Sequence, residues 1–537
     1  MKDCFQFLAV RALFSIALLV LACAVLLCSQ SVATSDVGQF GRVSFPTSCS
    51  PAVQNQMETG VALLHSFQYQ QAAQTFAEAA KQNPSCAMAY WGEAMSRYHQ
   101  LWDFPNPATI QKARETIEKA GSFNATTDRE RGYIAAAGAL YQDNSKLSHI
   151  ERVERYSQAL AELYRKYPDD VNAGAFYALS LVALAHEGEV EAANRKKAIA
   201  ILNPLFAAAP DNPGVAHYLI HAADTPELAP QGLAAARRYA QIAPDSSHAL
   251  HMPSHIFIRL GLWQEAIASN VAAAASASRA TRAGTGDSDY EFHAMDFLNY
   301  AYLQSGQESR ARQVAESVKD VAGANSEEIS DNHAILSARI ALDLHRWEDA
   351  VALPLPAVRP LWHDSTYFAR TIGAARSGNA KAARENSQNL QKAVAQREGK
   401  RRNEGYKTQA DKPLDLMEAE AWVDFVEARS SEAIDMMRAG CAREKQDGVD
   451  ATSIPACEML GDLYVELKRP AEALDAYKTS LAESPGRFDS LDGAALSAQL
   501  LGNKQLAHDY FAKLLASCDS AADRPELAGA RVFLAQK

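Results

Sequence analysis

The sequence predicts an all-α protein in which antiparallel helix pairs stack into a solenoid. First, a pattern of small, large apolar and proline residues recurs at a spacing of 34 residues along most of the chain. Second, no stretch between the copies shows the apolar–polar alternation that a half-buried β-strand requires. The length of 537 residues also exceeds what one hydrophobic core usually serves, which fits an extended array.

The clearest copy of the pattern begins at Val53. Its small residues allow two antiparallel helices to approach closely, its larger apolar residues fill the space between them, and its proline ends the second helix. The residues concerned are Gly60, Leu63, Ala72, Phe76, Ala79 and Pro84. This spacing resembles that of the tetratricopeptide repeat (TPR) family. The resemblance implies a right-handed superhelical solenoid in which the first helix of each pair lines a concave groove.

Further copies cover nearly all of the chain beyond the N-terminal segment. Pro210 and Pro244 close two successive units, and a sharp copy returns late in the chain. The residues of this late copy are Leu460, Gly461, Tyr464, Ala473, Tyr477 and Pro485. An insertion rich in Ala, Ser and Gly interrupts the pattern near residues 272–288. We therefore expect an N-terminal TPR array at 52–280 and a C-terminal array of more degenerate repeats at 290–537.

The N-terminus has the features of a secretory signal peptide. Lys2 and Arg11 accompany an apolar run from Ala12 to Cys28, and the small-residue sequence Ser31-Val32-Ala33 follows. We expect residues 1–33 to be a signal peptide and the protein to be secreted or periplasmic. Because the run is long for a signal peptide and short for a membrane span, an uncleaved membrane anchor is the alternative. No other segment is apolar enough to span, so no further membrane contact is expected.

Charge and motif content bear on the class of partner. The formal net charge is −11, and no basic stripe offers charge to neutralise phosphates, so a nucleic-acid partner is not expected. The chain has no phosphate-cradling glycine loop, no Gly-x-Ser-x-Gly elbow and no His-Glu-x-x-His motif. The sequence therefore predicts a protein that is not an enzyme of a recognised class.

The cysteines fit an oxidising compartment. Five of them lie beyond the signal peptide, and such cysteines can pair after export. Cys49 precedes the first expected helix and Cys86 the third, which are neighbours in a helical stack, while Cys441 and Cys457 flank a polar loop. We predict disulfides within these two pairs, with Cys518 left over. Five buried reduced thiols are the alternative.

Histidines gather at the groove positions that the TPR resemblance implies. In this family positions 2, 5, 9 and 12 of a first helix face the groove, and three consecutive first helices carry histidines or aspartates there. The predicted ligand-binding residues are His217, His221, Asp224, His251, His255, His293, Asp296 and Tyr300, and His248 occupies a further groove position.

Two of these histidine pairs have the spacing of metal ligands. His217 and His221 are four residues apart, His251 and His255 are four apart, and the second pair follows the first by 34 residues. Side chains at i and i+4 lie on one helix face about one turn apart, and imidazoles suit Zn, Cu, Ni or Fe. These four histidines are therefore candidate ligands of a divalent transition metal such as Zn. A polar surface for a carboxylate-bearing peptide and purely structural histidines are the alternatives.

A proline interrupts the second histidine pair. Pro253 takes a position where the repeat expects a large apolar residue inside the first helix. Proline removes a helical hydrogen bond and biases the preceding Met252 away from helical angles. The helix is therefore expected to kink or to start late between His251 and His255. Such local exceptions often mark functional sites.

Two functions follow from these features. The first is an exported TPR solenoid that acts as a scaffold and binds a protein or peptide ligand in its concave groove. The alternative is a metal-binding protein, or a metalloenzyme, whose metal is held by the histidines between His217 and His255.

Overall fold

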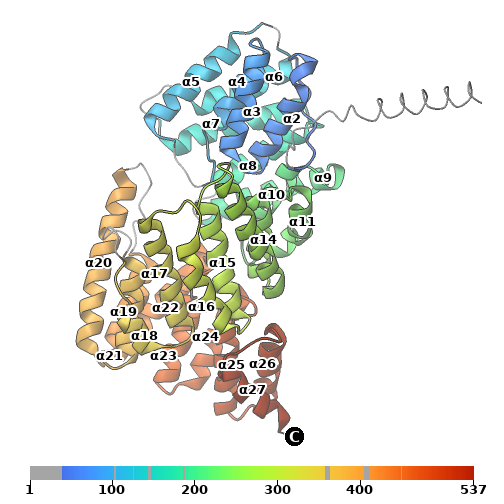
Figure 1. Cartoon of the computed structure of the whole chain (residues 1–537). Coiled ribbons are helices and arrows are strands. Elements are labelled where there is room, and N and C mark those ends of the chain that lie inside the picture. Colours follow the sequence, from blue (N-terminus) through green and yellow to red (C-terminus); the bar gives the residue numbers. More distant parts are fainter. Residues whose placement is uncertain are drawn as a thin grey trace, which may run out of the picture. The chain divides into compact units, whose positions relative to one another are not determined.

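Helices pack in consecutive antiparallel pairs along the chain. The computed structural model describes residues 39–101, 105–124, 126–142, 147–184, 188–356, 363–403, 412–448 and 450–536. Within these ranges the regular structure is helical and no strand occurs. The helix pairs follow one another in chain order (Figure 1). This confirms the predicted all-α, TPR-like solenoid of helix pairs.

The helices of the first half run from α2 to α14. Their bounds are α2 Gln54–His65, α3 Tyr69–Gln82, α4 Ala87–Met95, α5 Pro107–Gly121, α6 Asp128–Leu140, α7 His149–Lys166, α8 Val171–Ala183, α9 Gly188–Ala208, α10 Pro213–Ala223, α11 Ala229–Ile242, α12 Ser247–His251, α13 Pro253–Arg259 and α14 Trp263–Arg282. A short 3-10 helix at Pro51–Val53 precedes α2.

The second half continues from α15 to α27. The bounds are α15 Asp289–Gln304, α16 Glu308–Ser317, α17 Ser326–Asp343, α18 Trp347–Ala352, α19 Asp364–Arg376, α20 Ala380–Asn403, α21 Leu414–Val426, α22 Ser430–Asp447, α23 Ala456–Glu466, α24 Pro470–Glu483, α25 Phe488–Leu500, α26 Lys504–Ser517 and α27 Glu526–Ala535. Helices α14 and α15, which meet at the predicted boundary between the two arrays, pack directly against each other.

The predicted signal peptide at residues 1–33 lies outside the described residues. Among the described residues, no helix is both long enough and apolar enough to cross a membrane.

Close helix packing depends on the small residues of the repeat. A Cβ atom added at Gly60 would lie 2.6 Å from the ring of Phe76, and one added at Gly92 would lie 2.4 Å from the same ring. The Phe76 ring on α3, the second helix of its pair, thus fills the space that the two glycines leave open on the flanking first helices α2 and α4. The pair Gly461 and Gly493 stands in the same relation to Tyr477, so the distant copy of the repeat uses the same packing.

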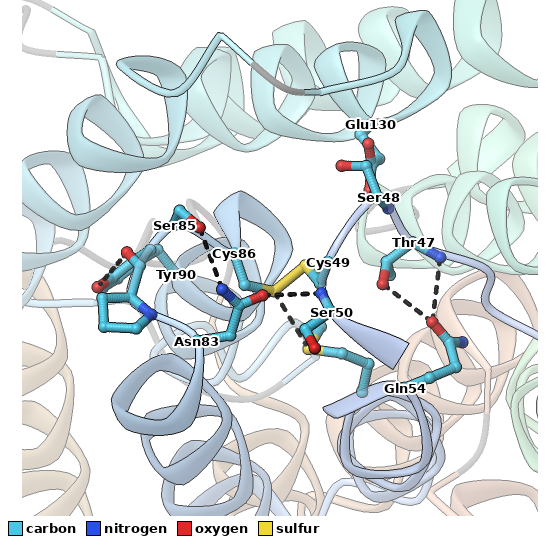
Figure 2. Close-up of a disulfide and its surroundings, with 12 residues drawn as sticks. Thr47, Ser48, Cys49, Ser50, Gln54, Asn83, Ser85, Cys86, Tyr90 and Glu130 are labelled. Atoms are coloured by element: carbon cyan, nitrogen blue, oxygen red, sulfur yellow. Dashed lines mark hydrogen bonds between the residues drawn. A yellow bond between two sulfur atoms is a disulfide. The ribbon is translucent and has the colours of Figure 1, made fainter. Parts of the chain in front are cut away.

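The structure contains both predicted disulfides. Cys49 is bonded to Cys86, which tethers the segment before α2 to the start of α4 (Figure 2). Asn83 supports this link, because its side-chain oxygen accepts a hydrogen bond of 2.8 Å from the Ser50 backbone N–H. The second disulfide joins Cys441 to Cys457, and Cys518 is free. Both pairings are those the sequence predicts.

The helix break at Pro253 is present. Helix α12 ends at His251 and α13 begins at Pro253, as expected for a residue that cannot donate a backbone hydrogen bond. Met252, however, keeps helical angles of φ −52° and ψ −35°, so the expected bias of this residue was wrong. The break follows from the missing N–H donor. The Ser269 hydroxyl donates to the Leu250 carbonyl near this break.

Candidate metal centre in the histidine cluster

Six histidines converge from three successive first helices. Helix α10 supplies two of them, the broken helix α12–α13 supplies three, and α15 supplies one. They form two groups of three, in each of which one ligand nitrogen per residue lies within 4.8 Å of the others. We call these groups the first triad, His217, His221 and His248, and the second triad, His251, His255 and His293. Together they are the histidine cluster.

The first triad is mostly buried, and His221 is its half-buried member. His217 and His248 are buried, and their Nε2 atoms lie 3.0 Å apart. The Nδ1 atom of His217 lies 2.6 Å from the backbone carbonyl of His65 on α2. A carbonyl can only accept, so Nδ1 carries the proton and Nε2 presents its lone pair to His248. A hydrogen bond from the second ring nitrogen is the usual support for a metal-binding histidine.

The second triad is built in the same manner. The Nε2 atoms of His251 and His255 lie 3.0 Å apart. The Nδ1 atom of His251 lies 2.7 Å from the side-chain oxygen of Asn270, and that of His255 lies 2.8 Å from a carboxylate oxygen of Asp224. The amide of Asn270 is oriented because its NH₂ group donates to the Ala266 carbonyl at 2.9 Å.

These anchors fix the protons of the second triad. Both Nδ1 atoms donate, so the neutral forms of His251 and His255 would direct two nitrogen lone pairs at each other across 3.0 Å. A positive charge between the two nitrogens removes this repulsion. In a metal-free chain a proton can fill that role, and a metal ion bound to both nitrogens fills it with no proton.

Burial keeps the imidazoles in the form that binds metal. Desolvation, reinforced by the neighbouring histidines, lowers the pKa of four of them well below the usual value. These are His217, His221, His248 and His251, and burial also lowers the pKa of His293 to about 4. They are neutral at pH 7, so a metal ion does not have to displace a proton from them.

Asp224 is the acidic support of the cluster. Burial disfavours its charge, but Arg259 and His255 outweigh this and hold the pKa of Asp224 well below its usual value. Its second oxygen accepts from Arg259 at 3.0 Å. A carboxylate behind a ligating imidazole fixes the ring orientation and raises its basicity. Asp224 caps the C-terminal end of α10 and therefore supports the triad without belonging to it.

Phe67 covers the first triad at the cost of a strained backbone. It lies in the turn between α2 and α3 with φ 55°, a left-handed conformation that costs a residue with a side chain about 1–2 kcal/mol. Glycine occupies the same place in the repeat at Gly261 and Gly306, where φ is 67° and 77°. The ring of Phe67 lies 4.3 Å from that of His217 and 5.5 Å from that of His248, measured between centroids. The side chain of Phe67 thus covers part of the first triad.

His65 connects the cluster to the start of the array. Helix α2 contacts α10, and the His65 ring lies against Asn172 at 3.0 Å and Tyr218 at 2.9 Å. Burial lowers the pKa of His65 to about 4, so this ring is also neutral. Gly214 makes the contact feasible, because a Cβ atom there would lie 2.2 Å from the ring of His65.

Replacing Gly214 by alanine should therefore destabilise the protein. The added methyl group must displace His65 and with it the carbonyl that anchors His217, an overpacking that costs roughly 1–3 kcal/mol. Chemical denaturation followed by circular dichroism measures the loss. Gly529→Ala in α27 is the matched control, since nothing lies within 4 Å of its added Cβ and alanine is the better helix former by about 1 kcal/mol. Equal effects of the two substitutions would contradict the packing argument.

The two remaining predicted ligand-binding residues, Asp296 and Tyr300, belong to neither triad, although the charge of Asp296 acts on His293. Asp296 pairs with Arg339 at 2.7 Å, and Tyr300 is 2% exposed with its hydroxyl 3.2 Å from Arg487. Tyr300 therefore belongs to a buried ion network and not to an open ligand surface. His293, by contrast, joins the second triad and is exposed.

Three residues of the site were not singled out in the sequence. His65, Phe67 and Asn270 hold or cover the triads, but His65 and Phe67 come from a repeat far earlier in the chain. Phe67 left no distinctive signal, because His345, Ala428 and Lys468 take the same left-handed turn position in other copies of the repeat. Nothing marks Asn270 either.

The comparisons with known proteins concern the fold alone. No family model matches the chain, and neither does any curated protein. Similar solved structures include a tetratricopeptide repeat protein from Parabacteroides merdae, with 14% identity, a TM-score of 0.30, and coverage of 54% of this chain and 97% of that one. Human IFIT1 as a dimer with PPP-AAAA has 14% identity, a TM-score of 0.34, and coverage of 85% and 89%.

A third similar structure is the Cut9–Hcn1 hetero-tetramer of the APC/C. It has 12% identity, a TM-score of 0.28, and coverage of 89% of this chain and 96% of that one. At such low scores the fold assignment rests on the helix pairs of this chain itself.

Proposed function

We propose that the chain is a transition-metal-binding protein whose metal site is the histidine cluster. The observation that carries the proposal is the contact between His251 and His255, in which both Nδ1 atoms are anchored by acceptors and both Nε2 atoms converge at 3.0 Å. A metal ion bound to both Nε2 atoms would remove the repulsion between their lone pairs without a proton.

The chemistry of the donors favours particular ions. Neutral imidazoles suit Zn, Cu, Ni and Fe, whereas Mg and Ca prefer oxygen ligands. A tetrahedral ion with Zn–N distances of about 2.0–2.1 Å needs its nitrogens within about 3.4 Å of each other. The Nε2 pairs at 3.0 Å are already near this spacing, and the ligand nitrogen of the third histidine in each triad lies within 4.8 Å of the other two.

Binding to the untagged full-length protein tests the proposal. The protein is treated with a chelator, dialysed, and titrated with Zn²⁺ or Cu²⁺ in a calorimeter. We expect saturable binding and, at an ion concentration 100 times the Kd, a stabilisation of about 2.7 kcal/mol. His255→Gln should weaken binding, whereas His508→Gln in α26, which changes an exposed histidine outside the cluster, should leave it unchanged. No binding heat and no thermal shift with either ion would overturn the proposal.

A second candidate function is peptide binding in the C-terminal array. A cavity of about 870 Å³ lies between α17, α19, α20, α21 and α22 and is lined by both acidic and basic side chains. Glu418 lines this cavity, is 5% exposed, and has one carboxylate oxygen without a hydrogen-bond partner. Burial, with Glu444 and Asp415 nearby, raises the pKa of Glu418 well above its usual value. A basic side chain of a bound peptide would reduce the repulsion among these carboxyl groups.

A tetralysine peptide is a direct probe of this cavity. Calorimetric titration should show binding of tetralysine that Glu418→Gln weakens, and no binding of tetraglutamate. Equal behaviour of the two peptides, or tetralysine binding unaffected by the substitution, would remove this candidate. Neither outcome bears on the metal proposal, since no residue of the triads lines the cavity.

Glu444 in the same cavity should make stability depend on pH. Burial raises its pKa to about 7, although the backbone N–H of Ala456 donates to it at 2.8 Å. Between about pH 4.5 and 7 the folded chain then holds a proton that the unfolded chain has lost, so the free energy of unfolding falls as pH rises.

Glu444→Gln should remove this part of the pH dependence. Between pH 5 and pH 8 the free energy of unfolding of the variant, relative to that of the wild type, should rise by on the order of 2–3 kcal/mol. Urea denaturation at both pH values measures the difference. Glu432→Gln, an exposed position on the same helix, is the control. Parallel pH profiles for wild type and Glu444→Gln would show that the carboxyl group is ionised alike in both states.

A further inference from the structure

The two triads lie close enough to act as one site. Rings of different triads are 6.4 Å apart for His221 and His255, and 6.4 Å apart for His248 and His251, measured between centroids. The longest spacing within a triad is nearly the same, 6.2 Å for His221 and His248. No gap in spacing therefore separates the triads. The six imidazoles form one continuous cluster.

The short helix α12 links the triads covalently. It runs from Ser247 to His251, and it gives His248 to the first triad and His251 to the second. Residues at i and i+3 of a helix are neighbours on one face, with Cβ atoms about 5–6 Å apart. The break at Pro253 then directs His255 back toward His251. Two ions held by these triads would lie close to each other.

The charge of the cluster bears on what would lie between two bound ions. The six ligands are imidazoles, so they bring no negative charge. The carboxylate of Asp224 lies behind His255, and Asp296 and Asp450 act electrostatically on His293 without belonging to either triad. Two divalent ions so close together would repel each other strongly in a buried site. A small anion between the ions would offset that repulsion, as in two-metal sites whose ions are about 3.5–4 Å apart.

We infer that the histidine cluster is a dinuclear centre, in which each of two metal ions is bound by three imidazoles and a small anion such as hydroxide or azide bridges them. This inference rests on the proposed metal-binding function and adds the stoichiometry, the pairing of the ions and the class of ligand. His293 of the second triad is exposed, whereas Phe67 packs on the first triad, in which His221 is half-buried.

Copper loading of the full-length protein tests the pairing. The chelator-treated chain is saturated with Cu²⁺, desalted, and assayed for copper by elemental analysis. Wild type should retain two ions per chain, and the variants His293→Ala and His248→Gln should each retain one. Circular dichroism verifies that each variant is folded, and His221→Gln replaces His248→Gln if the latter is not.

Spin resonance separates a pair of coupled ions from two independent ones. Two Cu²⁺ ions that share a bridging anion couple magnetically, so wild type with azide should give a signal well below its copper content. Each single-triad variant should give a signal equal to its copper content. Two ions with full signal, or one ion in the wild type, would overturn the dinuclear centre and leave the proposed function standing. No retained copper would overturn both.

Discussion

Replacing Asn270 by leucine should weaken metal binding by about 10- to 100-fold. Leucine matches the size of asparagine but offers no acceptor to the Nδ1–H of His251, which Asn270 now holds at 2.7 Å. Without that acceptor the proton can move to the nitrogen that faces the metal, and the ring can turn. Mutation of the residues that hydrogen-bond to metal-ligating histidines typically weakens metal affinity by this factor. Competition of the protein with a chromophoric chelator for Zn²⁺ measures the Kd.

Asn299→Leu is the matched control for this prediction. Asn299 is as buried as Asn270, and it likewise donates to a backbone carbonyl, that of Ala311, at 3.0 Å. Its substitution should therefore lower stability by a similar amount, while the Kd for Zn²⁺ stays within twofold of wild type. If both substitutions change the Kd equally, the effect comes from stability and not from the support of His251.

Replacing Arg487 by methionine should lower the free energy of unfolding by about 3–5 kcal/mol. The Arg487 guanidinium is fully buried and donates to both carboxylate oxygens of Glu458 at 2.8 Å and to Asp343 at 2.7 Å. Although burial disfavours its charge, these acids raise the pKa of Arg487 far above its usual value. Methionine would leave two buried carboxylates without a counter-ion, which is the costly way to break a buried ion pair.

The same network joins elements that are distant in sequence. Arg487 precedes α25, Glu458 lies on α23, Asp343 ends α17, and the hydroxyl of Tyr300 on α15 lies 3.2 Å from the guanidinium. The control is Arg237→Met, which removes an ion pair with Glu265 whose side chains are 56% and 40% exposed. That pair should contribute no more than about 1 kcal/mol. Urea denaturation of both variants measures the loss in free energy of unfolding. A loss for Arg487→Met as small as that for Arg237→Met would contradict a stabilising role of the buried network.

The repeat frame made much of the fold predictable. Gly60 and Phe76 recur at fixed positions because the packing of one helix pair is local, and the structure shows that ring filling the glycine's space. The same logic located the histidines. His217 and His251 occupy the same frame position in neighbouring repeats, so both had to lie on the same side of adjacent first helices. Local periodicity was sufficient for these conclusions.

The rest of the site depends on contacts that periodicity does not encode. Helix α2 meets α10 because of the way successive pairs stack, and only then does the His65 carbonyl reach His217. The resemblance to TPR proteins implied groove positions for Tyr300 and His217, yet both are buried. Both are buried by aromatic and charged side chains that come from other repeats. The repeat frame describes each repeat separately, so it does not predict these contacts.

The most direct test of the metal site is X-ray absorption at the edge of the bound ion. The full-length protein loaded with Zn²⁺ or Cu²⁺ should show a first shell made of imidazole nitrogens at about 2.0–2.1 Å, with the outer-shell scattering that imidazole rings produce. The outer-shell scattering from imidazole rings should decrease in the His255→Gln variant. A first shell of solvent oxygens, or of sulfur from Cys518, would contradict the assignment of the metal to the histidine cluster.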